Sequence, residues 1–128
     1  MIRPQYHGRH TDEGFLVWDV RRLVELARDL PVQDVPLETI GEFDENYWYQ
    51  SDDVVPTCRN IAEHMQLVQA ADLDYPILLC ADGRLMDGMH RVVKAHAEGR
   101  STIRAKTFPT TPEPDHRDVE LADLPYDD

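Results

Sequence analysis

Residues 75–95 constrain the fold more than any other part of the sequence. Residues 77–80 form an apolar run of the length of a buried strand. The pair Asp82-Gly83, between two apolar runs, predicts a tight hairpin turn into a second short strand at Leu85 and Met86. Gly88 then interrupts the pattern, and residues 90–97 are typical of a helix. The stretch therefore predicts two short strands joined by a turn, then a glycine and a helix.

The junction before this helix has the chemistry of an anion site. A helix that begins after Gly88 presents unpaired backbone N–H groups, and these favour a negative charge. His90 and Arg91 add donors, and an arginine can hold a phosphate through two parallel hydrogen bonds. Asp87 could hold a metal ion or accept a proton. This predicts a phosphate or nucleotide site. The alternative is a capping aspartate, a turn glycine and two solvated basic residues.

A resemblance to a known family rests on four segments of this region. They are Pro76-Ile-Leu-Leu, Asp82-Gly-Arg-Leu-Met-Asp-Gly-Met-His-Arg, Lys94-Ala and Gly99. Together they resemble the ParB/sulfiredoxin superfamily over about residues 57–108. The box Asp87-Gly88-Met89-His90-Arg91 is closest to the free-serine kinase-like branch. The resemblance implies an α/β fold in the loose sense (α+β), with a small mixed sheet and about three helices.

The same resemblance implies a nucleotide ligand. In the family this box binds nucleotide phosphates, so it implies nucleotide-binding roles for the box residues Gly88, Met89, His90 and Arg91. From the kinase-like branch, Asp87 takes a catalytic or metal-holding role. The expected ligands are ATP, ADP or CTP, with Mg²⁺ as a further ligand. Met89 stands where sulfiredoxins carry their catalytic cysteine and the partitioning branch a metal-holding glutamate. Nucleotide binding is therefore better supported than turnover, and sulfiredoxin chemistry is disfavoured.

Two acidic residues upstream are further catalytic candidates. In the kinase-like branch an upstream acid can act as base for the acceptor hydroxyl, which points to Glu42 and Glu38. The alternative is ordinary acidic loop surface. The aromatic run at residues 47–49 follows closely. It predicts either core packing against the first helix or a wall for a nucleotide base.

A second amphipathic helix is predicted over residues 58–71. Thr57 is a good N-cap, and Ile61 and Met65 begin an apolar stripe with four-residue spacing. In partitioning-type domains the corresponding helix closes the ligand pocket. Thr57, Asn60 and His64 are therefore site candidates, with a structural or surface role as the alternative for His64.

The N-terminal third is less patterned. Residues 1–13 are polar, and we expect a flexible N-terminus rather than a metal site at His7 and His10. Asp19 predicts the cap of an amphipathic helix of about three turns that ends at Pro31. Residues 35–37 suggest an edge strand, since proline cannot donate to a central ladder.

The sequence predicts one domain over residues 14–108. Within it, Gly99 should stop the helix after the box, and residues 102–108 alternate with the period of a strand. Residues 109–128 are rich in proline and acids, and we expect a loosely attached tail. The alternatives are that this tail wraps the domain or binds a partner.

Charge and composition limit the partners. The chain has 128 residues, a formal net charge of −12, and 13 Lys and Arg against 25 Asp and Glu. A duplex-binding surface needs a basic stripe, so this balance disfavours DNA. The sequence contains no apolar run approaching the roughly 20 residues of a membrane span. We expect Cys58 and Cys80 to be small core residues and the protein to be cytoplasmic.

Three functions remain open on the sequence. The first is a small phosphotransferase or nucleotide hydrolase acting on a small-molecule acceptor or water. The second is a nucleotide-gated module that binds a protein partner without turnover. The third, well behind, is a DNA-associated protein or nuclease, which the family allows and the charge opposes.

Overall fold

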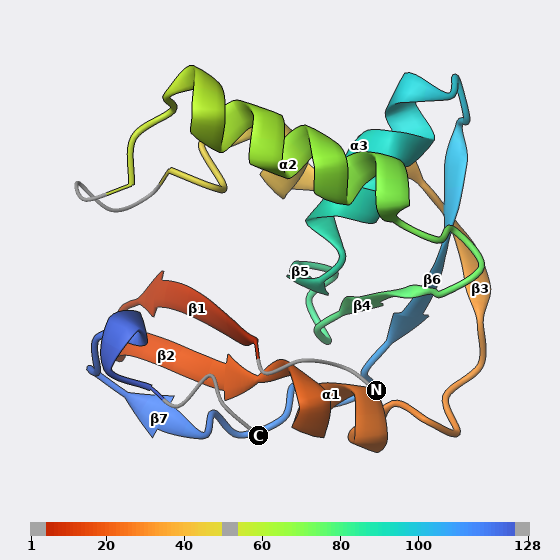
Figure 1. Cartoon of the computed structure of the whole chain (residues 1–128). Coiled ribbons are helices and arrows are strands. Elements are labelled where there is room, and N and C mark those ends of the chain that lie inside the picture. The colour runs from red at the N-terminus through yellow and green to blue at the C-terminus, as the bar shows by residue number, and fades with distance from the viewer. Residues whose placement is uncertain (1–4, 50–53, 125–128) are drawn as a thin grey trace.

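We describe the fold from a computed structural model, which describes residues 5–49 and 54–124. These residues form three α-helices, a three-stranded sheet and a four-stranded sheet (Figure 1). The expected α+β class, with a small mixed sheet and about three helices, is confirmed. The three-stranded sheet was not expected.

The four-stranded sheet carries the candidate box. Its strands lie in the order β3 (Gln33–Pro36), β6 (Thr102–Thr107), β4 (Ile77–Leu79) and β5 (Leu85–Asp87). β4 runs parallel to β6, and the other two pairs are antiparallel. β3 lies at an edge, as its proline predicted.

The strand–turn–strand–helix order predicted for residues 75–95 is confirmed. Gly83, at φ +82°, turns the chain between β4 and β5. Gly88 is the N-cap of α3 (Met89–Ala97) with φ +116°, a left-handed conformation that favours glycine. α3 ends at Ala97 with Glu98 as its C-cap, and Gly99 follows with φ +78°, which confirms the predicted helix stop.

Both faces of the four-stranded sheet are covered, which explains the unbroken apolar run in β4. Ile77 and Leu79 pack with α3 in one cluster, whereas Leu78 and Cys80 belong to a second cluster. The second cluster includes Trp18 of β2 and residues of α1 (Val20–Leu26). Figure 1 shows α2 and α3 on one side of β4 and β5, with α1 and the β1–β2 hairpin on the other.

α2 (Cys58–Ala70) confirms the predicted helix and its Thr57 cap, whose hydroxyl accepts the Asn60 backbone N–H at 3.1 Å. However, α2 buries none of its residues. Ile61 and Met65 of its apolar stripe are 43% and 56% exposed. Cys58 is exposed too, so its assignment to the core is wrong, whereas Cys80 is buried as expected.

The expectation of a flexible N-terminus is wrong for the part of residues 1–13 that the structure describes. β1 (Tyr6–Thr11) pairs antiparallel with β2 (Gly14–Asp19) in a hairpin. The strand was missed because its buried side chain is His7 rather than an apolar residue. The apolar strand signal belongs only to β2, which covers the buried Leu16, Val17 and Trp18.

α1 is shorter than predicted. Asp19 caps it by accepting the Arg21 backbone N–H at 2.9 Å, as expected. The helix ends at Leu26, however, and residues up to Leu30 continue as turns. Pro31 is therefore not its direct terminator.

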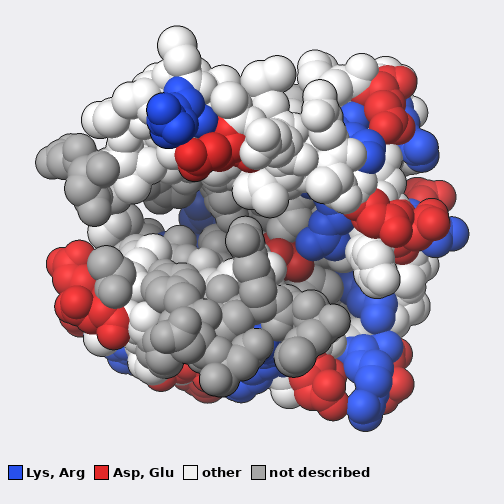
Figure 2. Space-filling view, viewed as in Figure 1, with Lys and Arg blue, Asp and Glu red and all other residues white. Residues whose placement is uncertain are grey.

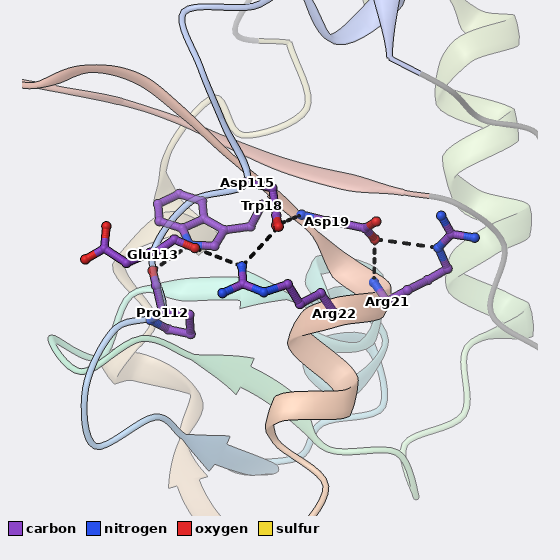
Figure 3. Close-up of polar contacts among 7 residues, drawn as sticks. All are labelled: Trp18, Asp19, Arg21, Arg22, Pro112, Glu113 and Asp115. Atoms are coloured by element: carbon purple, nitrogen blue, oxygen red, sulfur yellow. Dashed lines mark hydrogen bonds and ion pairs between the residues drawn. The ribbon is translucent and has the colours of Figure 1, made fainter.

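The expectation of a loosely attached tail is also wrong for much of residues 109–124. β7 (His116–Arg117) adds a third strand beside β2. The indole Nε1 of Trp18 donates to the Pro112 carbonyl oxygen at 2.8 Å, and Asp115 accepts the Asp19 backbone N–H at 2.8 Å (Figure 3). Arg22 donates to the Glu113 carbonyl at 2.8 Å. The tail wraps the domain because its carbonyls and carboxylates satisfy donors on β2 and α1.

Candidate functional site

Asp87 and Arg91 form the centre of the candidate site. Asp87 ends β5, and Arg91 lies one helical turn after Gly88 in α3. The Arg91 Nη2 donates to Asp87 Oδ2 at 2.8 Å, and the pair is about five-sixths buried, with side chains 17% and 16% exposed. Arg91 Nη1 also donates to the carbonyl oxygens of Tyr75 at 3.1 Å and Pro76 at 2.7 Å. The guanidinium is therefore held in one orientation.

Gly88 is required by close packing as well as by its dihedral angle. A Cβ atom at this position would lie 2.5 Å from Ile77 Cγ2 and 3.3 Å from Arg91 Cζ. A side chain would therefore displace β4 or the arginine. This glycine lets the start of α3 pack directly against β4, which brings Arg91 to Asp87.

A cavity of about 570 Å³ lies beside this ion pair. This volume falls within the usual range of ligand pockets, about 300–1,000 Å³. The cavity extends from Asp87 and Arg91 along α1 and β4, and most of its lining is apolar. Its lining residues are Gln5, Val20, Val24, Ala27, Arg28, Asp72, Tyr75, Pro76, Leu78, Asp87, Arg91 and Lys106.

Three basic side chains line this cavity. Besides Arg91 they are Lys106 of β6 and Arg28, which follows α1. Lys106 Nζ donates to the carbonyls of Ala27 and Arg28 at 2.9 and 3.1 Å, beyond the C-terminal end of α1. Arg28 pairs with Glu25 at 3.0 Å and is largely exposed. The cavity thus combines an apolar floor with three basic side chains, of which Arg91 and Arg28 are paired with Asp87 and Glu25.

Neither Lys106 nor Arg28 was a site candidate on the sequence. Lys106 alternates along β6, where it pairs with Leu78 of β4. Only the pairing of β4 with β6 reveals that Lys106 and Leu78 share a face, and no local pattern encodes that pairing.

The other box residues point elsewhere. Met89 is buried in the core cluster on the α3 side of the sheet. His90 lies beside α2, where its Nε2 is 2.9 Å from Nδ1 of His64. The structure therefore groups Asp87 with Arg91, and His90 with His64, rather than gathering all five box residues around one cavity.

The two upstream acids occupy different environments. Glu42, in the 3-10 turn Gly41–Asp44, is buried and accepts the Leu85 backbone N–H at 3.0 Å. It also pairs with Arg84 at 3.2 Å. Glu38, in the 3-10 turn Leu37–Thr39, is exposed. Neither lines the cavity beside Arg91, and Glu42 is held by the β4–β5 hairpin.

The aromatic run at residues 47–49 packs mainly around helices α2 and α3. Tyr47 and Trp48 pack against the core cluster that contains α3, rather than against the first helix. Trp48 also stacks on the rings of His64 and His90. Burial, together with the negative charges of Asp87 and Glu42, raises the pKa of Tyr47.

A buried polar cluster between the two sheets was not anticipated. His7 of β1 lies 3.4 Å from the Tyr47 hydroxyl, and Arg9 donates to the Leu85 carbonyl at 3.3 Å. Burial and the nearby charges of Arg9 and Arg84 lower the pKa of His7 to about 3. The only sequence signal was a histidine and an arginine two residues apart on one strand face.

The Cys80 thiol belongs to the same region. Burial alone would raise its pKa. Backbone N–H groups of Asp82 and Arg84, together with Arg9 at 3.7 Å, outweigh that effect and lower the pKa of Cys80. These groups therefore stabilise negative charge on a buried sulfur.

Two absences are observed in the part of the chain that the structure describes. No three His, Cys, Asp or Glu side chains within residues 5–49 and 54–124 are grouped to hold a metal, so Asp87 belongs to no such group there. Mg²⁺ is often held by one or two carboxylates together with substrate phosphates. None of the described helices has the length and apolar character to cross a membrane.

Comparisons of the chain with protein-family models, curated proteins and solved structures find no match.

Proposed function

We propose that this protein binds a nucleotide, with the phosphates beside Arg91 in the cavity between α1, β4 and the start of α3. The observation that carries the proposal is the oriented Arg91 guanidinium at the wall of a 570 Å³ cavity. Arginine forms charge-assisted hydrogen bonds with phosphate, and a fixed guanidinium loses less conformational entropy on binding. The resemblance of the box to nucleotide-binding ParB/sulfiredoxin proteins adds a second, independent argument.

The two parts of a nucleotide fit the two parts of this cavity. Apolar side chains of α1 and β4, such as Val24 and Leu78, offer a floor for a base and ribose. Arg91 and Lys106 offer positive charge for phosphates. A guanidinium has five N–H donors, so the three protein contacts of Arg91 leave capacity for a phosphate oxygen. ATP, ADP and CTP are the ligands we propose to test first.

Turnover would make the protein a small-molecule phosphotransferase or a nucleotide hydrolase. Asp87 has a second carboxylate oxygen besides the one paired with Arg91. That oxygen could contact Mg²⁺ held by the phosphates, or accept the proton of an acceptor hydroxyl. Positioning and charge neutralisation would supply most of the rate enhancement, as in other phosphoryl transfers. Glu42 accepts a hydrogen bond from the β4–β5 hairpin, and neither Glu42 nor Glu38 lines the cavity.

A nucleotide-gated module that binds a protein partner is the second candidate. It is favoured by α2, whose apolar stripe includes the exposed Ile61 and Met65. On the face shown in Figure 2, acidic and basic side chains are interspersed, an arrangement that suits a protein partner better than DNA. We place either function in the cytoplasm, in keeping with two free cysteines.

Binding and turnover are tested separately. Isothermal titration with ATP, ADP and CTP should give weaker binding for Arg91→Lys. This variant keeps the positive charge but loses the parallel N–H donors of the guanidinium. Arg100→Ala, which removes an exposed guanidinium outside the cavity lining, should bind like the parent chain. Equal affinity of Arg91→Lys, Arg91→Ala and the parent chain would remove the cavity from the proposal.

Asp87→Asn separates the enzyme from the module. If the protein turns over ATP, phosphate release or acceptor phosphorylation should fall at least about 100-fold in this variant, the lower range for loss of a general base. Tight nucleotide binding by the parent chain without any release of phosphate supports the module.

A further inference from the structure

Two histidines from different helices meet end to end outside the nucleotide cavity. His64 of α2 and His90 of α3 place Nδ1 and Nε2 2.9 Å apart. Their ring centroids are 5.1 Å apart and the ring planes differ by 24°. Each ring nitrogen therefore lies close to the line joining the centroids. The rings share one proton in a nearly coplanar N–H···N hydrogen bond, so one nitrogen must present a lone pair to the other.

Trp48 holds this pair in place. Its ring stacks on His64 at a centroid distance of 4.1 Å and on His90 at 4.9 Å. Tyr49 approaches His64 edge-on at 5.9 Å. These aromatic contacts hold the planes of the two imidazoles and keep the two nitrogens together.

Asn60 supplies the second observation. Its side-chain Oδ1 is buried and has no hydrogen-bond partner in the described part of the chain. A buried acceptor without a partner is unusual and costs about 1–3 kcal/mol. Asn60 lies four residues before His64 in α2, so the two side chains share one face of the helix. An unsatisfied oxygen one helical turn from His64 is suited to a cationic ligand.

We propose that His64 Nδ1, His90 Nε2 and Asn60 Oδ1 form a binding site for a divalent transition metal, with water or substrate in the remaining positions. Metal–imidazole bonds of about 2.1 Å place two nitrogens roughly 3.0 Å apart at a right angle and roughly 3.4 Å apart in a tetrahedron. The observed 2.9 Å is close to the right-angle separation, and each ring must turn by roughly 45° to direct its nitrogen at a metal beside the line of centroids. Metal binding would release the proton that the two rings share.

The ligand set selects the class of metal. Imidazole nitrogen suits Zn²⁺, Ni²⁺ and Cu²⁺, whereas Mg²⁺ prefers an all-oxygen shell. The site is separate from the nucleotide cavity, since none of its three ligands lines that cavity. It does not depend on the proposed nucleotide function.

The first test uses the unmodified chain. The protein has six histidines. In imidazole ¹⁵N–¹H correlation spectra, substoichiometric Zn²⁺ should shift the resonances of His64 and His90, with the other four unchanged. Each pair of resonances is assigned from single substitutions. Zn²⁺ shifts confined to other histidines, or none at equimolar Zn²⁺, would overturn the site.

Substitutions give the second test. Isothermal titration with Ni²⁺ and Zn²⁺ should show affinity reduced at least about 100-fold in His64→Gln and His90→Gln, because even loss of an outer-shell partner costs 10–100-fold. His96→Gln, an exposed histidine of the same helix, should bind like the parent chain. Unchanged affinity in either ligand variant would contradict the proposal.

Asn60→Leu separates ligation from packing. It removes the unsatisfied oxygen at similar volume, so the metal-free chain should keep or gain stability, whereas Ni²⁺ affinity should fall several-fold. A chain that binds Ni²⁺ as tightly as the parent would overturn the three-ligand site, whatever its stability.

Discussion

Glu42 is the only acidic side chain that is fully buried among the described residues, at 5% exposed. Its carboxylate accepts the Leu85 backbone N–H and pairs with Arg84, so it connects the 3-10 turn Gly41–Asp44 to strand β5. A catalytic base must reach its substrate, whereas this carboxylate is occupied by the hairpin. Glu42 therefore has a structural role rather than a catalytic one.

We therefore expect Glu42→Ala to destabilise the fold. The change leaves the buried Leu85 N–H without its acceptor, which costs about 1–3 kcal/mol in the free energy of unfolding. Glu42→Gln keeps an oxygen for that N–H and should lose less. Urea denaturation of both variants measures the difference, with the exposed Glu38→Ala as control. Equal stability of Glu42→Ala and Glu38→Ala would refute the buried role of Glu42.

His7 should make stability depend on pH. Its pKa is 6.5 in the unfolded chain and about 3 in the native state. As pH falls below 6.5 the unfolded chain takes up a proton that the native state rejects. The contribution of neutral His7 is therefore complete above pH 6.5 and is lost progressively down to about pH 3. Between pH 7 and 5 the loss should be about 2 kcal/mol, at 1.36 kcal/mol per pH unit.

Urea midpoints at pH 7 and pH 5 measure this effect. His7→Gln, which cannot titrate, should lose about 2 kcal/mol less than the parent chain over that interval. The comparison cancels the other titrating groups, because they are common to both chains. The same pH dependence in both proteins would show that His7 is readily protonated in the native state.

At the scale of elements, the junction of β5 and α3 depends on Gly88. Gly88→Ala would force a Cβ to 2.5 Å from Ile77 Cγ2 at a positive φ. Gly99 also has a positive φ, but a Cβ there would meet nothing within 4 Å. Gly99→Ala therefore measures the cost of the backbone conformation alone. We expect about 1 kcal/mol for Gly99→Ala and at least about 2 kcal/mol for Gly88→Ala. Chemical denaturation gives both values, and equal costs would exclude the close contact with β4.

The C-terminal segment is an element of the fold. Removing residues 110–128 takes away β7, the acceptor of the Trp18 indole and the acceptor of the Asp19 N–H. Leaving the buried Trp18 indole N–H without its acceptor should cost about 1–3 kcal/mol, and loss of the more exposed contact to Asp19 adds to that cost. Removing only residues 125–128 leaves these contacts in place and serves as the control. Thermal melts that coincide for the two truncations would contradict this role.

The sequence predicted the elements wherever hydrophobic periodicity and caps coincide. Residues 75–99, with their Asp-Gly turn, apolar strand and glycine stop, folded as expected, and Thr57 and Asp19 cap helices as predicted. The β1 strand and β7 were missed because both are polar and gain their stability from pairing with β2. The pairing of β7 with β2 joins residues about 100 positions apart, and local patterns do not encode it.

The candidate site was predictable only in part. The i, i+4 spacing of Asp87 and Arg91 in the sequence is compatible with the observed ion pair. The separation of His90 from Arg91 follows from helix geometry, since adjacent residues point about 100° apart. That His90 meets His64 depends on how α2 packs on α3, which required the tertiary structure.

At the scale of the whole molecule, a chain of net charge −12 gathers Arg28, Arg91 and Lys106 around one apolar cavity. Asp72 and Asp87 line the same cavity, so the site offers a few localised cationic donors, which suit a compact anion better than an extended polyanion. This arrangement is consistent with the proposed nucleotide and gives DNA little to bind. It also separates the cavity from the histidine pair on the opposite side of the sheet.

The most direct test is the shift in melting temperature of the full chain with ATP, ADP, CTP and GTP, each with and without Mg²⁺. A ligand at 100 times its dissociation constant stabilises the native state by about 2.7 kcal/mol, which should raise Tm by more than about 5 °C. We expect such a shift with at least one nucleotide, reduced in Arg91→Lys and retained in Arg100→Ala. A folded parent chain whose Tm does not move with any of the four, at millimolar concentration with or without Mg²⁺, would contradict nucleotide binding.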